Sequence, residues 1–576
     1  MFALPPQQTC TPRAGRKPTA PLGYQPRDAE AGVLQRVVRE HLLTFLERAA
    51  ESTDGSGVPR FVERQLRRFV DCGVLAKGFA RFRCDGCHAD RLVPFSCKGR
   101  GFCPSCGGRR MAERSAHLID AVLPHVPVRQ WVLSLPQPLR YLFAFNHTLC
   151  RKALSIYARA LMALQRRRAR RVGIDDGRSG TATVIQRFAS GLRLNVHFHT
   201  LMLDGVFHEA GDGELRFHPL PPPDETCIAK LVATVRRRIA RMLVREGLLD
   251  DEHRPTEVSD ADDSDADASD PSATLRALAS AAVRNTQSFG AHRGAPVMRI
   301  GREPNAPWVC SRAPLHANVG GFDLHAAAAT EADDREGLEH LTRYLLRPAV
   351  AQQRLTLEPD GNVRVELKSA WSDGTTHLCL EPLDLLGRLA ALTPRPHTNL
   401  LIYHGLLAPN ARWRRRVVRY GRPPLNAATE LVSHEAAATT ASPTQTPLAC
   451  ESSLGRAPLA CRAPPPTAMV QIADATAHSG AIEPALQRAL SPLATYCKPV
   501  ARPSTTSPCK RRHHLWADLM RRTFAIDVLA CDQCGGRLRL IATIESPAAI
   551  RAILEHLGLP SEPPALTPTS GRPSNV

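Results

Sequence analysis

Residues 192–203 read LRLNVHFHTLML, and the fold is best worked out from this stretch. Its residues alternate as in a strand with one buried face, and successive side chains of a strand point to opposite faces. His197 and His199 therefore project from one face, whereas Phe198 turns into the core on the other. Neutral imidazoles in this arrangement suit a divalent ion with an open coordination position. Two unconnected histidines on a half-exposed sheet are the alternative.

The preceding run, TATVIQRF at residues 181–188, predicts a partner strand. The turn ASG at residues 189–191 would join the two strands in a hairpin. With Ser190 and Gly191 as the turn pair, Gln186 lies opposite Asn195 and diagonal to His197 on the same face. Gln186 is therefore the candidate third metal ligand, and a slip of one residue would turn it away.

VHFHTLMLDGVF, following VIQRF, resembles the His-hydrophobic-His motif of the rolling-circle nucleases. It is similar in particular to the zinc-domain rolling-circle transposases of bacterial insertion sequences. The resemblance implies an N-terminal cysteine-rich domain joined to a nuclease domain whose nucleophile is a tyrosine further along the chain.

The composition favours a DNA-binding protein of several domains. The chain has 576 residues, a net charge of +20 and an isoelectric point near 9.7, so a polyanion is the natural partner. No apolar run approaches the roughly 20 residues that a membrane span needs, and the first residues do not have the pattern of a signal peptide. We expect a cytoplasmic bacterial protein, associated with the nucleoid through DNA, whose 17 cysteines are thiols and metal ligands rather than disulfides.

A block of cysteines gives the strongest local signal. Cys84-x-x-Cys87 and Cys103-x-x-Cys106 are separated by 15 residues, a spacing that lets two turns close a tetrahedral structural zinc site. Four thiolates leave no open position for catalysis. The same block contains three further potential ligands, Cys72, His88 and Cys97. They could replace members of this set or belong to a second, partial site. Otherwise, Cys72 and Cys97 are small buried side chains.

Basic residues surround this block in FSCKGRGFCPSCGGRR. They are candidates for contacts to DNA phosphates, with a solvated charged surface as the alternative: Lys98, Arg100, Arg109 and Arg110. The sequence from CGVLAKGFARFRC to VRQWVLSLPQPLRY is also similar to the zinc-binding domain of the transposases named above.

The predicted nucleophile is Tyr344. Thr330 and Asp333 resemble a capping box that opens a helix through REGLEHLTRYLL, and Arg343 and Arg347 flank the tyrosine. Arginine favours the phenolate and can hold a scissile phosphate. HLTRYLLRP is similar to the tyrosine motif of the family, but His340 stands where many members carry a second tyrosine, which implies a single-tyrosine variant. Tyr403, in the apolar run NLLIYHG, is the rival nucleophile.

A second CxxC pair lies near the C-terminus. Cys531 and Cys534 with Gly535 and Gly536 resemble a zinc-ribbon turn, and a plain glycine-rich turn is the alternative. The pair supplies only two ligands, so a complete site needs others. The nearest candidates in the sequence are Cys509, His513 and His514.

These observations predict an α+β multidomain protein. The segments are a disordered tail (1–28), a zinc-binding DNA-recognition domain (29–125), an antiparallel-sheet nuclease domain with packed helices (126–420), a flexible linker (421–510), a small CxxC module (511–560) and a tail (561–576). An acidic disordered insert spans residues 250–272.

The implied function is a DNA transposase that cleaves and rejoins single-stranded or hairpin element ends through a 5′-phosphotyrosine. Zn²⁺ would be structural, and Mg²⁺ or Mn²⁺ would be the catalytic ion. No GxxxxGK[ST] sequence occurs, so a helicase would have to come from the host. A replication initiator or relaxase is the alternative within the same chemistry. A non-catalytic zinc-dependent DNA-binding protein is the alternative of another class.

Overall fold

The computed structural model describes residue 29 and residues 31–52, 57–250, 271–303, 314–422 and 516–566. The predicted N-terminal tail, nearly all of the acidic insert and the predicted linker from residue 423 lie outside these ranges. The candidate ligands Cys509, His513 and His514 also lie outside them.

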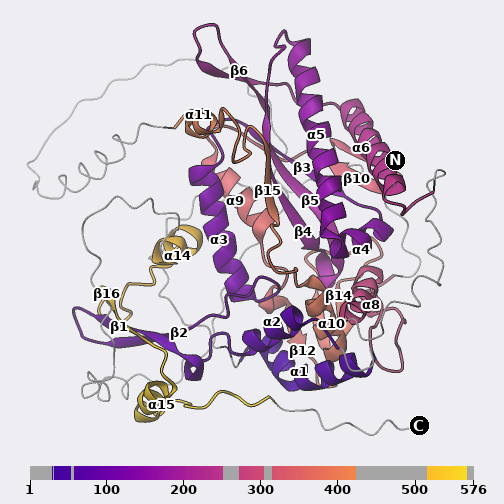
Figure 1. The fold of residues 1–576 in the computed structure, drawn as a ribbon. Coiled ribbons are helices and arrows are strands. Elements are labelled where there is room, and N and C mark those ends of the chain that lie inside the picture. Colours follow the sequence, from indigo (N-terminus) through magenta and orange to yellow (C-terminus); the bar gives the residue numbers. More distant parts are fainter. Residues whose placement is uncertain are drawn as a thin grey trace, which may run out of the picture.

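A seven-stranded antiparallel sheet forms the centre of the described structure. Its strand order is β15-β4-β5-β3-β10-β9, and the short strand β11 pairs with β3 (Figure 1). The hairpin of β4 and β5 predicted from the histidine-containing stretch is confirmed. The strands are β3 (Val128–Ser134), β4 (Gly180–Phe188), β5 (Leu194–Leu203), β9 (His316–Val319), β10 (Phe322–His325), β11 (Ala329–Thr330) and β15 (Leu401–Gly405).

Helices cover both faces of this sheet (Figure 1). On the first face Phe198 is fully buried and stacks on Tyr157 of α5. The helices on this side are α4 (Gln137–Phe145), α5 (His147–Arg171), α6 (Glu225–Arg245), α8 (Pro271–Arg284) and α10 (Pro382–Leu392). On the second face Val184 and Leu201 share a core with Leu338 and Leu345 of α9 (Arg335–Leu346). The helix α3 (Pro104–Ala121) packs against α9 on that side.

The register of the β4-β5 hairpin differs from the prediction. Gln186 lies opposite His197 rather than Asn195. The connection is a 3-10 turn, Ser190–Leu192, in which Gly191 and Leu192 both have positive φ, and a bulge between Gln186 and Phe188 precedes it in β4. These features displace the pairing by two residues. A displacement of two preserves the face of the strand, so Gln186 still projects on the side of the histidines.

The N-terminus of α9 is capped differently from the prediction. The side chain of Asp334 accepts a hydrogen bond of 2.8 Å from the Gly337 backbone N–H, so Asp334 is the N-cap. The hydroxyl of Thr330 instead donates to the Val128 carbonyl, because Thr330 belongs to β11. The capping box of Thr330 and Asp333 was therefore wrong, although the helix itself was predicted.

Smaller units surround the central sheet. Two further hairpins lie at residues 204–219 and 354–367. The strands are β6 (Gly205–Glu209) with β7 (Leu215–Pro219), and the four-stranded sheet of β12 (Leu355–Leu357), β13 (Val363–Glu366), β14 (His377–Leu380) and β8 (Met298–Ile300). The remaining α-helices of this part are α1 (Val33–Glu51), α2 (Arg60–Val70) and α11 (Arg414–Arg419), and the other short 3-10 helices are Leu75–Lys77 and Gln352–Arg354.

A third sheet joins the two ends of the described chain. Its order is β16-β1-β2, so a strand of the C-terminal segment pairs with a strand of the N-terminal cysteine block (Figure 1). The elements are β1 (Phe79–Cys84), β2 (Asp90–Pro94), β16 (Leu538–Ile544), α14 (Trp516–Phe524) and α15 (Pro547–His556). Residues that were predicted as two separate modules therefore share one sheet and one small core.

Candidate active site and metal centres

The two histidines of β5 lie side by side under the second helical layer. His197 and His199 retain only 8% and 5% of their exposure, and their Nε2 atoms are 3.0 Å apart. Two imidazole nitrogens that each lie about 2.1 Å from one ion, at a right angle, are about 3.0 Å apart. The spacing of the pair therefore fits a shared metal ion.

The other ring nitrogens orient the pair. The Nδ1–H of His197 donates to the Asn195 carbonyl at 3.0 Å, which leaves Nε2 with a free lone pair. The Nδ1 of His199 lies 2.9 Å from the side-chain amide of Gln130 on β3. The Nε2 of Gln130 faces the ring and donates to Nδ1, so the ring proton of His199 lies on its Nε2 and donates to the Nε2 of His197. A flip of the Gln130 amide would bring its oxygen to Nδ1, where it would accept the ring proton and leave the Nε2 of His199 for an ion.

Burial keeps both rings neutral. Together with the charges of Arg347 and Arg140, it lowers the pKa of His197 to about 4. Burial also lowers the pKa of His199 well below its ordinary value, and the neighbouring His197 adds to this effect. Neutral imidazole is the form that binds a metal ion.

Gln186 completes a potential set of three ligands. Its Nε2 donates to the Leu345 carbonyl at 3.1 Å, which fixes the amide. Its Oε1 is buried and has no hydrogen-bond partner among the described residues. A buried amide oxygen without a partner is costly unless something else binds it. Since Gln186 lies opposite His197 on the same face, an ion bound by the pair would fit this atom.

Tyr344 lies at the edge of the histidine pair. It projects from α9 with 40% of its surface exposed, and its ring meets that of His199 edge-on, with centroids 6.3 Å apart. The guanidinium of Arg347 lies 4.2 Å from the centre of the Tyr344 ring, and the Lys368 ammonium lies 4.5 Å from it. An accessible tyrosine is thus surrounded by cations beside a potential metal site.

Tyr403, the rival nucleophile, is a strand residue. It lies on β15 opposite Ala182, and burial raises the pKa of its phenol. Its neighbours are the second-face core and Arg414, whose guanidinium is 5.5 Å from the ring centre. Among the described ring contacts, Tyr344 and not Tyr403 meets the histidine pair.

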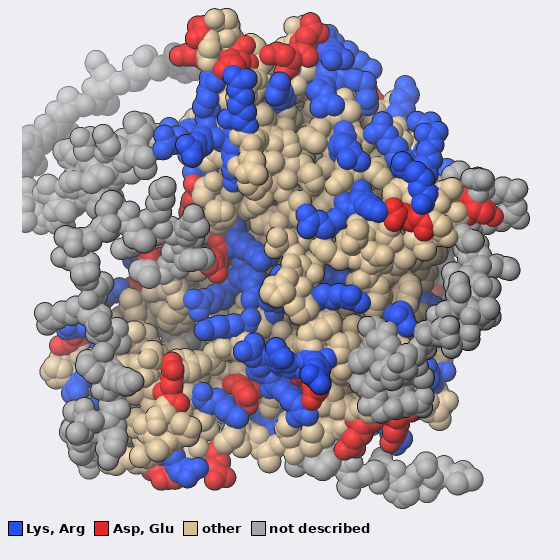
Figure 2. Space-filling model, in the orientation of Figure 1, with Lys and Arg blue, Asp and Glu red and all other residues tan. Residues whose placement is uncertain are grey.

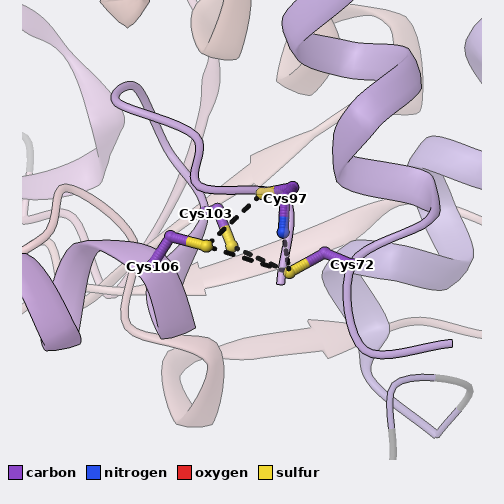
Figure 3. A group of neighbouring side chains, drawn as sticks. All are labelled: Cys72, Cys97, Cys103 and Cys106. Carbon is purple, nitrogen blue, oxygen red and sulfur yellow. Dashed lines mark hydrogen bonds between the residues drawn. The ribbon is translucent and has the colours of Figure 1, made fainter. Parts of the chain in front are cut away.

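Eight cysteines form two groups of four, in which the CxxC pairs are combined differently from the prediction. Cys103 and Cys106 lie with Cys72 and Cys97, and we call these four the inner cluster (Figure 3). Cys84 and Cys87 lie instead with Cys531 and Cys534, and we call these four the bridging cluster. In each group the ligand atoms lie within 4.8 Å of one another. The prediction that Cys84, Cys87, Cys103 and Cys106 share one site was therefore wrong.

The inner cluster has the geometry of a closed thiolate site. The sulfurs of Cys97 and Cys106 are 3.5 Å apart, and those of Cys72 and Cys103 are 3.6 Å apart. Figure 3 shows the four sulfurs pointing toward one another from the segment after α2, the loop after β2 and the start of α3. Four converging thiols with no other ligand suit a structural zinc ion.

Two family models match the chain. Residues 180–415, which include β4, β5 and α9, match a putative transposase, and residues 37–135, which include the inner cluster, match the zinc-binding domain of IS91 transposases. The chain belongs to the IS91-like transposase family. DNA is therefore a partner of this transposase. No curated protein and no solved structure matched it.

The transposase presents many basic side chains on the face shown in Figure 2. They gather between the regions of α3 and α2, near the inner cluster. Three of the four predicted phosphate contacts in this region are exposed, namely Lys98, Arg100 and Arg109. No helix among the described residues is long and apolar enough to cross a lipid bilayer.

Four of the arginines predicted to contact DNA also donate hydrogen bonds within the transposase. Arg110 donates to the carbonyls of Gly99 and Lys98, at 2.8 and 3.1 Å, and so fixes the loop of the inner cluster. Arg343 donates to Glu339 and to the Thr523 carbonyl. Arg100 donates to the Thr398 carbonyl and Arg347 to the Tyr344 carbonyl, and the phosphate contacts of all four arginines stay predictions.

Several residues near the site were not found from the sequence. Gln130, Arg140 and Lys368 have no pattern that marks them, because strand pairing and loop packing bring them to the site. His316 and His325 were also missed; their Nε2 atoms lie 3.1 and 3.0 Å from one Asp323 oxygen. This group is on the same sheet face as the histidine pair but two strands away, about 10 Å, so the two groups do not share one ion.

Proposed function

We propose that this transposase cuts and rejoins single-stranded DNA at the ends of its insertion sequence by a rolling-circle-like mechanism, with Tyr344 as the nucleophile. The observation that carries the proposal is the position of Tyr344. Its exposed ring lies edge-on to His199. His199 and His197 are buried, and their Nε2 atoms are 3.0 Å apart.

The chemistry requires one nucleophile and a group to stabilise phosphate charge. The Oη of Tyr344 forms a bond to phosphorus while the bond from phosphorus to the 3′ oxygen breaks. The phenol loses its proton, and the departing oxygen takes one up to become a 3′ hydroxyl. Attack by a 3′ hydroxyl on the 5′-phosphotyrosine rejoins a strand and frees Tyr344.

The surrounding side chains have separate tasks. Arg347 and Lys368 lie over the Tyr344 ring, so their charges attract the scissile phosphate to the nucleophile. His197, His199 and Gln186 would hold Mg²⁺ or Mn²⁺, which when bound polarises the scissile phosphate. The partnerless Oε1 of Gln186 supports this set of ligands.

The sequence around Tyr344 limits the mechanism. His340 stands one helical turn before Tyr344 in α9, where a second tyrosine would be needed to pass the strand between two nucleophiles. A single tyrosine must therefore act, be released and act again. The exposed side chains of Lys98, Arg100 and Arg109 are suited to hold the element end, and a host helicase would supply the single strand.

The test is cleavage of labelled single-stranded DNA from the element's own ends, with Mg²⁺ or Mn²⁺. We expect a denaturation-resistant protein-DNA adduct in the wild type, none in Tyr344→Phe or His197→Ala, and an undiminished adduct in Tyr403→Phe. An adduct that persists in Tyr344→Phe would move the nucleophile to Tyr403. Binding without any adduct would favour a non-catalytic DNA-binding protein.

A further inference from the structure

The bridging cluster is assembled from two distant parts of the sequence. Cys84 and Cys87 come from the turn between β1 and β2, whereas Cys531 and Cys534 come from the turn before β16. The sulfurs of Cys84 and Cys534 are 3.5 Å apart, and those of Cys87 and Cys531 are 3.6 Å apart. Each turn thus faces the other with both of its thiols.

The two turns have matching backbone geometry. The Gly86 N–H donates to the Cys84 sulfur and the Gly536 N–H donates to the Cys534 sulfur, each at 3.4 Å. In the inner cluster the Gly99 N–H makes the same bond to Cys97 at 3.3 Å. A Cβ on Gly536 would lie 3.1 Å from the Cys84 sulfur, so a larger residue there would have to displace that sulfur by a few tenths of an ångström.

We propose that the bridging cluster is a second structural zinc site, which fastens the C-terminal segment to the N-terminal zinc-binding domain. Half of its ligands lie beyond residues 37–135, the range that matches the family's zinc-binding domain. Four thiolates complete a tetrahedral shell, so this zinc has no open position and a structural role.

The strands beside the cluster support the same connection. Six residues of β1, from Phe79 to Cys84, pair with β16. Phe79 and Ile544 are buried in one core with α15, and salt bridges between Arg91 and Asp532 and between Arg539 and Asp85 cross the junction. Such a small core is weak without a metal or another cross-link, because it buries little apolar surface.

The site has a consequence for the nucleophile helix. The helix α14 ends at Phe524, seven residues before Cys531, and Arg522 on α14 pairs with both Asp120 of α3 and Glu339 of α9. From α9, Arg343 donates to the Thr523 carbonyl at 3.2 Å. Arg343 directly precedes Tyr344. The bridging zinc therefore anchors a helix that braces α9, and this step rests on the role proposed above for Tyr344.

Zinc content tests the site directly. We expect two zinc ions per purified full-length chain in the wild type, one in Cys531→Ser/Cys534→Ser and two in the control Cys379→Ser, whose thiol lies outside both clusters. One zinc in the wild type, or two in the double variant, would overturn the proposal. Two disulfides in place of zinc would do so as well, and would appear as a loss of four thiols on titration.

Cobalt binding tests the site in the wild-type sequence, so the result does not depend on a variant that folds. Two equivalents of Co²⁺ should each produce the absorption of cobalt bound by four thiolates. Saturation at one equivalent would contradict a second site. This measurement involves no DNA, so it stands even if Tyr344 forms no adduct.

Hydrogen exchange tests the brace on α9. In Arg522→Gln we expect two zinc ions and faster exchange at residues 516–524 and 335–346, with β4 and β5 unchanged. Loss of the bridging zinc in Cys531→Ser/Cys534→Ser should accelerate exchange in the same helices. Unchanged exchange of α9 in both variants would refute the coupling and would leave the metal site to be judged by its zinc content.

Discussion

The two polar atoms of the buried Gln186 amide have different roles, one in the fold and one in metal binding. Its Nε2 is held by the Leu345 carbonyl at 3.1 Å, and its Oε1 is left without a partner among the described residues. An apolar side chain of similar size would fill the space but would offer no oxygen to an ion. The two roles can therefore be separated by substitution.

We expect Gln186→Leu to weaken Mn²⁺ binding at the histidine pair by at least about tenfold, since even outer partners of metal ligands change affinity by roughly 10- to 100-fold. Titration calorimetry with Mn²⁺ measures this. The control is Thr183→Val on the opposite face of β4, which loses a 2.9 Å bond to Thr200. It should cost about 1 kcal/mol of stability and leave Mn²⁺ affinity unchanged. Equal affinity in Gln186→Leu would remove Gln186 from the ligand set.

Two neighbouring arginines of α3, Arg109 and Arg110, should likewise separate a binding role from a structural role. Arg109 is exposed, whereas Arg110 is bonded to two carbonyls of the inner-cluster loop. We expect Arg109→Gln to reduce the slope of log K against log salt for single-stranded DNA by about 0.7, without loss of stability. Arg110→Gln should instead lower the free energy of unfolding by about 1–3 kcal/mol. Anisotropy titrations at several KCl concentrations and urea unfolding would reveal the reverse pattern if the assignment is wrong.

At the scale of elements, the sequence pattern was enough to predict β4, β5 and α9. The alternation around Phe198 placed the histidines on one face. The pairing of Gln186 could not be predicted, because it depends on a 3-10 turn with two positive φ angles and on a bulge. Because the displacement is two residues, Gln186 still projects from the same face of the sheet as the two histidines, as expected.

The cap of α9 gives a prediction that distinguishes two neighbouring residues. We expect Asp334→Ala to lower the free energy of unfolding by about 1 kcal/mol, because its carboxylate satisfies the Gly337 N–H. Thr330→Ala should have a smaller effect, since its bond to Val128 is long, at 3.3 Å. Urea unfolding of both variants measures the difference. A larger loss in Thr330→Ala would restore the capping box that the sequence suggested.

Phe198→Ala and His197→Ala should separate stability from activity within one strand. Phe198 is fully buried against Tyr157, so its truncation should cost about 3–5 kcal/mol. His197→Ala should abolish the DNA adduct with a smaller change in unfolding free energy. Thermal unfolding and the adduct assay, run on both variants, check the pair. Severe unfolding in His197→Ala together with a stable Phe198→Ala would reverse the assignment of the two faces.

At the scale of the whole molecule, the cysteine pairs show where sequence spacing stops being informative. Two CxxC pairs separated by 15 residues are compatible with one site, and nothing local indicates another partner. The partner of each pair is decided by the pairing of β1 with β16, and Cys87 lies 444 residues from Cys531. Cys72 and Cys97 carry no CxxC signature, so their place in the inner cluster follows only from the fold.

The two clusters should release zinc at different rates. In the inner cluster Cys72, Cys103 and Cys106 are buried, whereas in the bridging cluster Cys534 is exposed and Cys87 is partly exposed. A thiol reagent with a chromogenic zinc chelator should therefore release one zinc quickly from the bridging cluster and one slowly from the inner cluster. The fast phase should be absent in Cys531→Ser/Cys534→Ser and present in Cys379→Ser. Slow release alone in the wild type, or a fast phase that survives in the double variant, would show that the exposed thiols hold no zinc. Because the fast phase also removes the anchor of α14, hydrogen exchange in α9 should accelerate with it and precede the loss of the inner zinc.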